Sequence, residues 1–558
     1  MSEISTTFGI DLGTTYSCIS YMKDGHATVC ANREGEYTTP SIVQMLPTES
    51  TPIVGKTAKD TSILYADDTI QFVKSKIGLV ESFEIGDEDN RRSVTPIQVS
   101  AEILKKLAAD AAADTNMEVK DVVITVPAYF GTNERDATIQ AGIEAGLNVI
   151  GLVEEPTAAA FYYLCEKDDA DATVCVFDLG GGTFDITAIQ KKGTEIQVIT
   201  SEGNHDLGGK NWDAALITLV EQKFKEATGM SEDEPLDDND FMQNLQLNCE
   251  KAKKQLSSAT SASIPLNWDR QHKANVVVTR DEFDQITAST LLEDAIELTR
   301  KVFAFLEEKG IKVDKLLLVG GSSRMPQVET ALNAEFGSKV DEILVNEPDF
   351  SVAKGASIYC AWSMLNQVEV GKEFNSGVNA SDGETKKETV IDKAVDEETG
   401  ATVITLEGEA GEQRKVVIDG QIPGSLQGMV IKTVATKSFG IRVLINGEPK
   451  ISNLIVKDTV LPAVFEQSFG TNYNDQRDLS IALYQSDLRD SVYEPDYGIV
   501  IGNSVLSGLP EGLPANSPVN IRIELSVDGV IVITGSYNGT PLDGELSTNY
   551  AEGVATQQ

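Results

Sequence analysis

Strand-like and helix-like hydrophobic patterns alternate along the first 365 residues of the chain. Short apolar runs predict buried strands at residues 8–10, 16–21, 121–126, 173–177, 186–189 and 316–319. Apolar side chains at helical spacing predict a helix over residues 99–113. Such an alternation is typical of an α/β fold with helices covering its sheets, so we expect one such domain over residues 1–365.

A different pattern begins at residue 429. Apolar and polar residues alternate over residues 441–445, 479–484, 519–527 and 530–536. Asn-Gly or Asp-Gly pairs at 446–447, 528–529 and 538–539 separate or flank these runs at hairpin spacing. We therefore expect an all-β sandwich over residues 429–547, with a polar tail at 548–558 and no helical domain after it.

The segment between these two parts, residues 366–428, is rich in Glu, Gly, Thr and Lys. Two interpretations are open. Its charge is typical of a solvated acidic linker, whereas short alternating runs at 402–406 and 415–418 favour a small inserted β-structure.

The charge and the cysteine and histidine content of the chain argue against several classes of protein. The 558 residues include 46 basic and 87 acidic side chains, a net charge of −41, which argues against general binding to nucleic acid or to an anionic membrane. Six scattered cysteines and three histidines form no zinc-binding pattern. No apolar run is long enough to span a bilayer, and the first residues lack a signal-peptide pattern. We expect a cytoplasmic protein.

Three glycine-rich turns carry the candidate chemistry. They lie at residues 9–16 (GIDLGTTY), 177–185 (FDLGGGTFD) and 318–326 (LVGGSSRMP). Glycines allow backbone N–H groups to approach phosphate oxygens closely. Asp11 and Asp178 occupy equivalent places in the first two turns, and two facing carboxylates suit a hydrated Mg²⁺ ion. Neither a P-loop nor a dinucleotide-binding motif is present.

These turns resemble those of the actin-like ATPases, and specifically of the heat-shock 70-kDa (DnaK-type) chaperone family. Further similar runs lie at residues 126–130 (VPAYF), 145–149 (AGLNV), 155–160 (EPTAAA), 207–209 (LGG) and 250–257 (EKAKKQLS). The resemblance covers residues 8–362 and resumes over about 429–546. It implies duplicated RNase H-like halves that bind ATP and Mg²⁺, weak ATPase activity, and a β-sandwich that binds exposed apolar polypeptide segments in protein folding and the stress response. J-domain co-chaperones and nucleotide exchange factors are possible partners.

The resemblance also assigns roles to individual residues. It implies that Lys74, Glu155 and Thr183 are catalytic, with Lys76 as the alternative register for the lysine, and that Asp11 and Asp178 hold the metal-bound waters. The implied nucleotide-binding residues are Gly13, Thr14, Thr15, Tyr16, Gly180, Gly181, Gly182, Glu250, Lys253, Lys254, Ser257, Gly320, Gly321, Ser322, Arg324 and Asp349. The implied peptide-binding residues are Ile441, Leu444, Phe469, Leu479 and Ile481.

The sequence departs from the family pattern in several places. No helical lid follows the β-region, from which we expect fast peptide exchange. The interdomain linker is replaced by residues 429–434 with Thr433 at the acidic position, and Gly151 stands where J-domain partners commonly contact an arginine. Lys254 replaces an arginine over the adenine and lacks its planar stacking surface.

Two alternatives to a chaperone ATPase remain. One is a nucleotide-binding adaptor or regulatory subunit that hydrolyses little ATP; the intact glycine turns favour the ATPase over it. The other is a sugar kinase of the same superfold, which the predicted β-sandwich disfavours.

Overall fold

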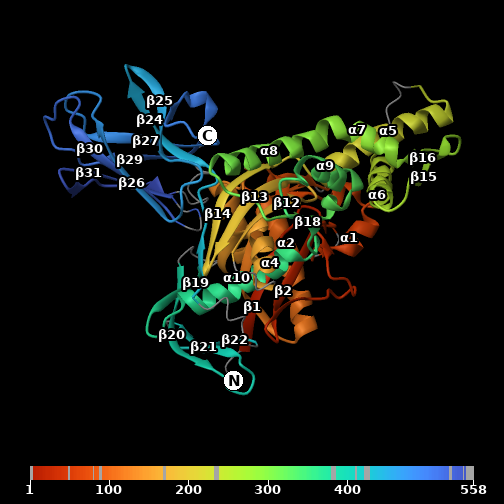
Figure 1. Ribbon diagram of the computed structural model, residues 1–558, viewed down its shortest axis with the longest axis horizontal. Helices are drawn as coiled ribbons and strands as arrows, with labels where there is room; N and C mark the ends of the chain where they lie inside the picture. Colours follow the sequence, from red (N-terminus) through yellow and green to blue (C-terminus); the bar gives the residue numbers. More distant parts are fainter. Residues whose placement is uncertain are drawn as a thin grey trace.

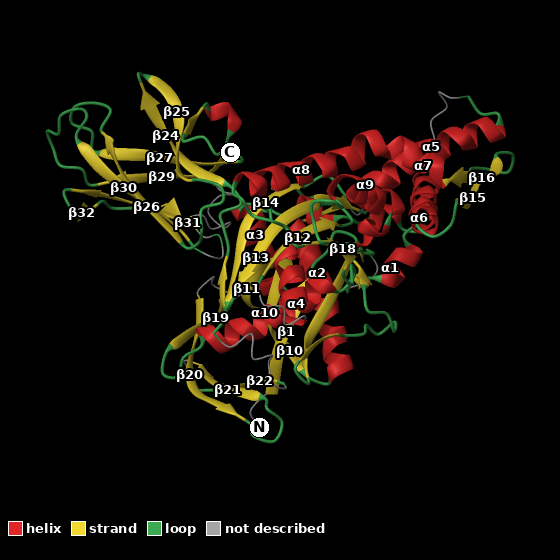
Figure 2. Cartoon of the chain, viewed as in Figure 1, coloured by secondary structure: helices red, strands yellow, loops and turns green. Residues whose placement is uncertain are grey.

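The computed structural model describes most of the chain. The described residues are 4–47, 49, 51–79, 81–86, 91–166, 171–231, 238–378, 385–408, 411–419, 428–526, 529, 531–544 and 546–547. Helices and strands alternate up to residue 367, and strands dominate the rest (Figure 2).

Two sheets with the same strand arrangement form the centre of the amino-terminal half. The first contains β11 (Asn148–Glu154), β10 (Glu118–Val126), β1 (Ile4–Asp11), β2 (Tyr16–Lys23), β3 (His26–Val29) and β4 (Thr39–Pro40). The second contains β18 (Glu342–Val345), β17 (Lys315–Val319), β12 (Ala172–Leu179), β13 (Phe184–Lys192) and β14 (Glu195–Asn204). In each sheet a hairpin (β1–β2 or β12–β13) is followed by a parallel strand beside its first member. The two halves are therefore topological duplicates.

Two helices, α4 (Glu155–Glu166) and α10 (Ser351–Gln367), pack against each other. Helix α4 contacts strands of both sheets, whereas α10 packs against the first. The remaining helices are α1 (Lys56–Thr61), α2 (Pro96–Thr115), α3 (Thr132–Glu144), α5 (Gly209–Thr228), α6 (Asn239–Leu256), α7 (Arg280–Thr287), α8 (Glu293–Glu308) and α9 (Pro326–Phe336). Helix α2 begins at a capping box in which the Thr95 hydroxyl accepts a bond from the Gln98 N–H. The apolar residues whose spacing predicts this helix lie on its buried face.

Short strands complete the outer parts of this half. They are β5 (Val43–Gln44), β6 (Ile53–Val54), β7 (Thr69–Ile70), β8 (Phe83–Ile85), β9 (Arg92–Val94), β15 (Ser261–Asn267) and β16 (Lys273–Thr279). The β15–β16 hairpin lies near α5 and α6, at the end of the molecule farthest from the carboxy-terminal strands (Figure 1).

The acidic segment contributes a four-stranded antiparallel meander, β19 (Glu373–Val378), β20 (Thr385–Val395), β21 (Thr402–Gly408) and β22 (Gln413–Ile418). Strand β22 pairs in parallel with the start of β1, beside the amino terminus, so the meander extends the first sheet (Figure 1). Val390, Ile404 and Leu406 are fully buried in a core shared with α10. The described part of residues 366–428 thus has the strands that the second sequence interpretation favours.

The carboxy-terminal half is a sandwich of two antiparallel sheets. One contains β28 (Val492–Tyr493), β25 (Glu448–Ile455), β24 (Ser438–Ile445), β27 (Asp478–Ser486) and β29 (Ile499–Ser507). The other contains β26 (Ala463–Gly470), β30 (Pro518–Leu525), β31 (Ile531–Tyr537), β32 (Thr540–Pro541) and β33 (Leu546–Ser547). The Asn446–Gly447 and Asn538–Gly539 turns have positive φ at both residues, as a two-residue hairpin of type I′ requires. The predicted 528–529 turn and the 548–558 tail fall partly or wholly outside the described residues.

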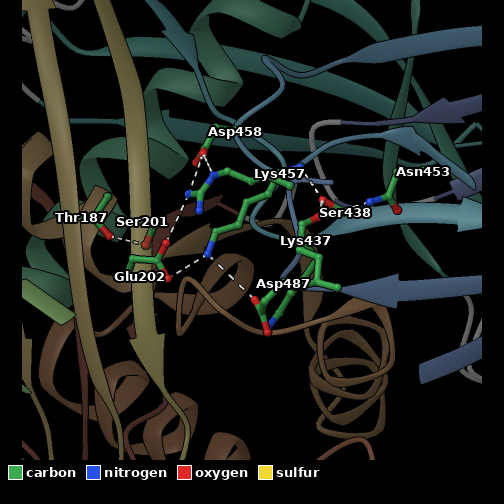
Figure 3. A network of polar contacts seen from close by, with 11 residues as sticks. Thr187, Ser201, Glu202, Lys437, Ser438, Asn453, Lys457, Asp458 and Asp487 are labelled. Carbon is green, nitrogen blue, oxygen red and sulfur yellow. Dashed lines mark hydrogen bonds and ion pairs between the residues drawn. The ribbon is translucent and has the colours of Figure 1, made fainter. Parts of the chain in front are cut away.

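The sandwich is docked against the amino-terminal half. Strand β23 (Val430–Lys432) pairs in parallel with the edge of β14, and a polar network lies beside it (Figure 3). In that network Lys457, only 4% exposed as a side chain, donates to Glu202 at 3.0 Å. Arg489 donates to Glu202 at 3.2 Å and to Asp458 at 2.8 Å. These ion pairs join β14 to the loops of the sandwich.

Candidate functional site

The three glycine-rich turns meet at a cavity of about 550 Å³ between the two sheets of the amino-terminal half. The predicted nucleotide-side residues that line it are Asp11, Gly13, Thr14, Thr15, Tyr16, Lys74, Glu155, Asp178, Gly180, Gly181, Thr183, Glu250, Lys253, Lys254, Ser257, Gly320, Gly321, Ser322, Arg324 and Asp349. Gly182 packs behind the lining, against Thr14. Segments that are far apart in the sequence are therefore brought to one place.

The first two turns face each other directly. A Cβ atom on Gly181 would lie 2.2 Å from the Thr15 hydroxyl, and one on Gly182 would lie 2.5 Å from the Thr14 side chain. Such distances exclude any larger residue at these two positions without a shift of the turn. The glycines therefore let the Thr14 and Thr15 turn close against the opposite sheet.

Lys74 and Glu155 form a buried ion pair in this cavity. Lys74 lies on the short 3₁₀ helix Val73–Lys76 and is 4% exposed; Glu155 lies in the first turn of α4, where the helix dipole favours a carboxylate. Lys76, in contrast, is partly exposed and pairs with Glu81 at 3.0 Å. The structure thus places Lys74, and not Lys76, in the cavity.

Carboxylates crowd the region around Lys74. The pKa of Asp11 is raised to about 7, mainly by burial and to a lesser extent by the negative charge of Glu155. Lys74 and a 3.3 Å hydrogen bond from the Thr125 hydroxyl act in the opposite direction. Burial, followed by the charges of Glu155 and Asp11, raises the pKa of Asp178 well above its ordinary value. Asp185 is buried nearby, and its Oδ1 atom has no hydrogen-bond partner among the described residues. This donor set is short of positive charge and fits a cation.

The cavity is also lined by four side chains that pair with one another, Tyr16, Lys59, Glu250 and Lys254, which we call the ionic clasp. Lys59 donates to Glu250 at 2.5 Å and to the Tyr16 hydroxyl at 2.9 Å, and Lys254 donates to the same two groups at 2.7 and 2.9 Å. Burial opposes ionisation of Glu250, but Lys59 and Lys254 outweigh it and lower its pKa to about 2. The clasp joins the two lobes, which are the parts of the amino-terminal half built on the first and on the second sheet. Helix α1, with Lys59, packs beside β4 of the first sheet, and α6, with Glu250, belongs to the core of the second.

Further polar contacts fix the second and third turns. Lys253 donates to the Gly209 carbonyl at 2.8 Å and to Asp213 at 2.7 Å. The Ser322 hydroxyl donates to the Gly180 carbonyl at 2.8 Å, and Arg324 pairs with Asp349 at 2.5 Å. The residues predicted for the adenosine side are thereby tied to the residues predicted for the phosphate side.

Several cavity residues are absent from the sequence-based prediction. Lys59 and Asp213 form ion pairs with partners 191 and 40 positions away, and Tyr37 and Phe350 line the cavity from two different loops. No local pattern marks these side chains, because each is defined by a neighbour that only the fold brings near.

The predicted peptide-binding residues are divided between the core and the surface of the sandwich. Ile441 and Ile481 are 4% and 5% exposed and belong to its core, against which Phe469 and Leu479 pack while partly buried. Leu444 is 53% exposed and lies next to the Asn446–Gly447 turn. Their role in peptide binding stays a prediction.

Among the residues that the structure describes, no group of three or more histidine, cysteine or acidic side chains is placed to hold a metal ion directly, so the carboxylates of the cavity suit a cation that keeps its bound waters. No described helix combines the length and apolar character needed to cross a membrane.

Comparison with protein-family models agrees with the geometry of the cavity. The model described as Hsp70 protein matches residues 7–371, which include all three glycine turns, both lobes and the Lys74–Glu155 pair. Members of this family have an actin-like ATPase fold and act as chaperones. Because the match covers well over half of the 558 residues, the chain belongs to the Hsp70 family.

Proposed function

We propose that this protein is an ATP-dependent chaperone that binds exposed apolar polypeptide segments under the control of the nucleotide in its cavity. The observation that carries the proposal is the buried Lys74–Glu155 pair, which lies beside Asp11 and Asp178 where three glycine turns meet. A cation, a carboxylate and backbone N–H groups around one cavity are the parts that phosphoryl transfer needs.

Each of these side chains would have its own role in ATP hydrolysis. Asp11 and Asp178 would hold Mg²⁺ through its bound waters, and the ion would offset charge on the phosphates. Lys74 places a fixed positive charge where negative charge develops on the transferring group. Glu155 accepts a proton or a hydrogen bond from the attacking water, and the Thr183 hydroxyl positions this water.

The docked sandwich supports nucleotide control of peptide binding. Strand β23 is part of the second sheet, two strands away from the β12–β13 turn that carries Asp178 and Thr183. A movement of this sheet on nucleotide binding would reach the sandwich through β23 and through the Glu202 ion pairs. An extended peptide would pair with the sandwich backbone and place an apolar side chain in a pocket.

Single-turnover ATP hydrolysis by the purified chain tests the proposal. We expect slow turnover in the unmodified protein. Lys74→Ala should lower the rate by about 10²- to 10³-fold, because a positioned charge acts mainly in the transition state. ATP affinity should change much less. Lys76→Ala, which removes an exposed lysine two residues away, is the matched control and should hydrolyse ATP like the unmodified protein.

The same assay separates the proposal from its alternative. If the unmodified protein binds Mg-ATP but shows no turnover, the nucleotide-binding adaptor is the better description. A loss of turnover in Lys76→Ala with normal turnover in Lys74→Ala would refute the assignment of the lysine. Addition of an extended apolar peptide should change the rate if the two halves communicate.

A further inference from the structure

A lysine of the second lobe bonds to the helix that carries Lys74. The Lys210 ammonium donates to the Ser75 hydroxyl at 3.2 Å, and Ser75 directly follows Lys74 on the 3₁₀ helix Val73–Lys76. Lys210 lies in the first turn of α5. Because Ser75 is half-buried and the Lys210 side chain is 19% exposed, the hydrogen bond between them is partly shielded from water.

This bond joins two elements that are packed into different cores. The 3₁₀ helix packs against α2, and its Val73 and the adjacent Ile77 are buried in the core of the first lobe. Helix α5 buries Trp212 and Leu216 in the core of the second lobe. A relative movement of the two lobes would therefore change the distance between Lys210 and Ser75.

The backbone of Lys210 is fixed to the second glycine turn. Its N–H donates to the Gly181 carbonyl at 2.7 Å, and the N–H of the preceding Gly209 donates to the Gly180 carbonyl at 3.0 Å. Gly180 and Gly181 both line the cavity. Lys210 thus contacts this turn through its backbone and the helix of Lys74 through its side chain.

The helix of Lys74 is short and starts from an unfavourable backbone conformation. Phe72, which precedes it, has a φ of 57°, in the left-handed region that residues with a Cβ atom rarely adopt. The Ser75 N–H donates to the Phe72 carbonyl at 3.0 Å, and the Ile77 N–H donates to the Lys74 carbonyl at 3.4 Å. A 3₁₀ helix of four residues has few internal bonds, so its placement depends on contacts with its neighbours.

We propose that Lys210 is a positioning residue, which holds Lys74 in place relative to the glycine turn of the opposite lobe through its bond to Ser75. This inference rests on the proposed function and adds a residue to the same site. Lys210 is not among the residues that line the cavity, so it acts through the helix of Lys74. A positioned charge stabilises the transition state only when its geometry is accurate. Loss of the bond should therefore slow hydrolysis more than it weakens ATP binding.

Single-turnover hydrolysis of bound Mg-ATP, with Mg-ATP affinity measured separately, tests this role. We expect Lys210→Met to slow hydrolysis by about 5- to 50-fold and to change the affinity by no more than about twofold. Ser75→Ala should slow hydrolysis by a similar factor. The double variant should be no slower than the slower single variant, because both substitutions remove the same contact. Lys210→Arg keeps the charge and the N–H donors and should restore most of the rate.

Two control variants separate the positioning role from a loss of other contacts of α5. Lys223→Met replaces a lysine of the same helix that donates to Glu282 at 2.6 Å, and neither of these residues lines the cavity. Asp206→Asn changes the partner that Lys210 has within the second lobe, at 2.9 Å, and leaves Ser75 in place. Both variants should hydrolyse ATP like the unmodified protein.

The remaining outcomes overturn the proposal. They are an unmodified rate in Lys210→Met or in Ser75→Ala, losses that multiply in the double variant, and a loss of Mg-ATP affinity as large as the loss of rate. A loss in Asp206→Asn equal to that in Lys210→Met would assign the effect to the ion pair within the second lobe. If the unmodified protein binds Mg-ATP without turnover, the proposed function fails, and the role of Lys210 fails with it. Normal turnover in every variant overturns the role of Lys210 alone.

Discussion

Replacing Arg414 by methionine tests how firmly the meander is built into the first sheet. Arg414 lies on β22 and is 6% exposed; its guanidinium donates to Glu388 of β20 at 2.6 and 2.8 Å and to Asp121 of β10 at 3.0 Å. Asp121 and Glu388 are 0% and 3% exposed. Methionine keeps most of the side-chain volume and removes the charge, so two buried carboxylates lose their shared cation.

The expected loss follows from that burial. Removal of one partner of a buried ion pair costs about 3–5 kcal/mol, because the remaining charge stays desolvated without compensation. Here one cation serves two carboxylates, so we expect a value in the upper part of that range. Arg414→Lys retains the charge but cannot form the same bidentate bonds, and it should lose less than Arg414→Met.

Hydrogen exchange of individual amides is the suitable assay, since it reports each part of a two-domain chain separately. In Arg414→Met, amides of β20–β22 should exchange roughly 10³- to 10⁴-fold faster, whereas amides of β30 and β31 should not change. Lys415→Met is the matched control, because Lys415 is the next residue on β22 and is exposed. Equal protection in Arg414→Met and Lys415→Met would refute the reasoning.

Three further predictions concern the ligand sites. The double variant Asp11→Asn with Asp178→Asn should lose the Mg²⁺-dependent part of its ATP affinity in a calorimetric titration, and unchanged affinity would show that the metal assignment is wrong. The unmodified protein and Glu250→Gln should differ in stability by a constant amount from neutral pH down to about 4.5, and this difference should vanish toward pH 2. The reason is that the pKa of Glu250 is lowered from 4.5 to about 2 in the folded state. Thermal melts over this pH range check the prediction, and a difference that disappears near pH 6 would contradict it. Stopped-flow release of a labelled apolar peptide should differ clearly between ATP and ADP, because β23 and the Glu202 ion pairs connect the second sheet to the sandwich; equal release rates with the two nucleotides would contradict nucleotide control of peptide binding.

The sequence predicts this fold well where the information is local. Strands β10, β12 and β17 are short apolar runs between polar turns, and each contains the predicted residues with one or more added at an end. The Asn446–Gly447 turn needs two residues with positive φ, which Asn-Gly provides. In both cases the side chains near one another in sequence decide the structure.

Other features depend on partners that are distant in sequence. Arg414 and Asp121 are 293 positions apart, so an acidic composition over residues 366–428 gives no sign that one arginine anchors the segment inside a core. Ile441 and Ile481 have the alternating pattern of any sandwich strand, and the pattern alone does not separate a core position from a cleft position. The local sequence also does not decide whether Lys74 or Lys76 lies in the cavity. The two are distinguished by distant partners, because Lys74 pairs with Glu155 of α4 and Lys76 pairs with Glu81.

The charge of the cavity limits how a nucleotide could bind there. Asp11, Asp178, Asp185 and Glu155 surround Lys74, in a chain whose net charge is −41. A nucleotide adds several negative charges to this acidic cavity. The other cationic side chains that line it, Lys59, Lys253, Lys254 and Arg324, are already paired with Glu250, Asp213 or Asp349. Lys74, itself paired with Glu155, offsets only part of the added charge. The glycine turns donate N–H groups but no net charge. On the proposed function, the phosphates could enter only together with a divalent cation that the aspartates retain, so nucleotide affinity in this protein should depend on the cation more steeply than on any single side chain.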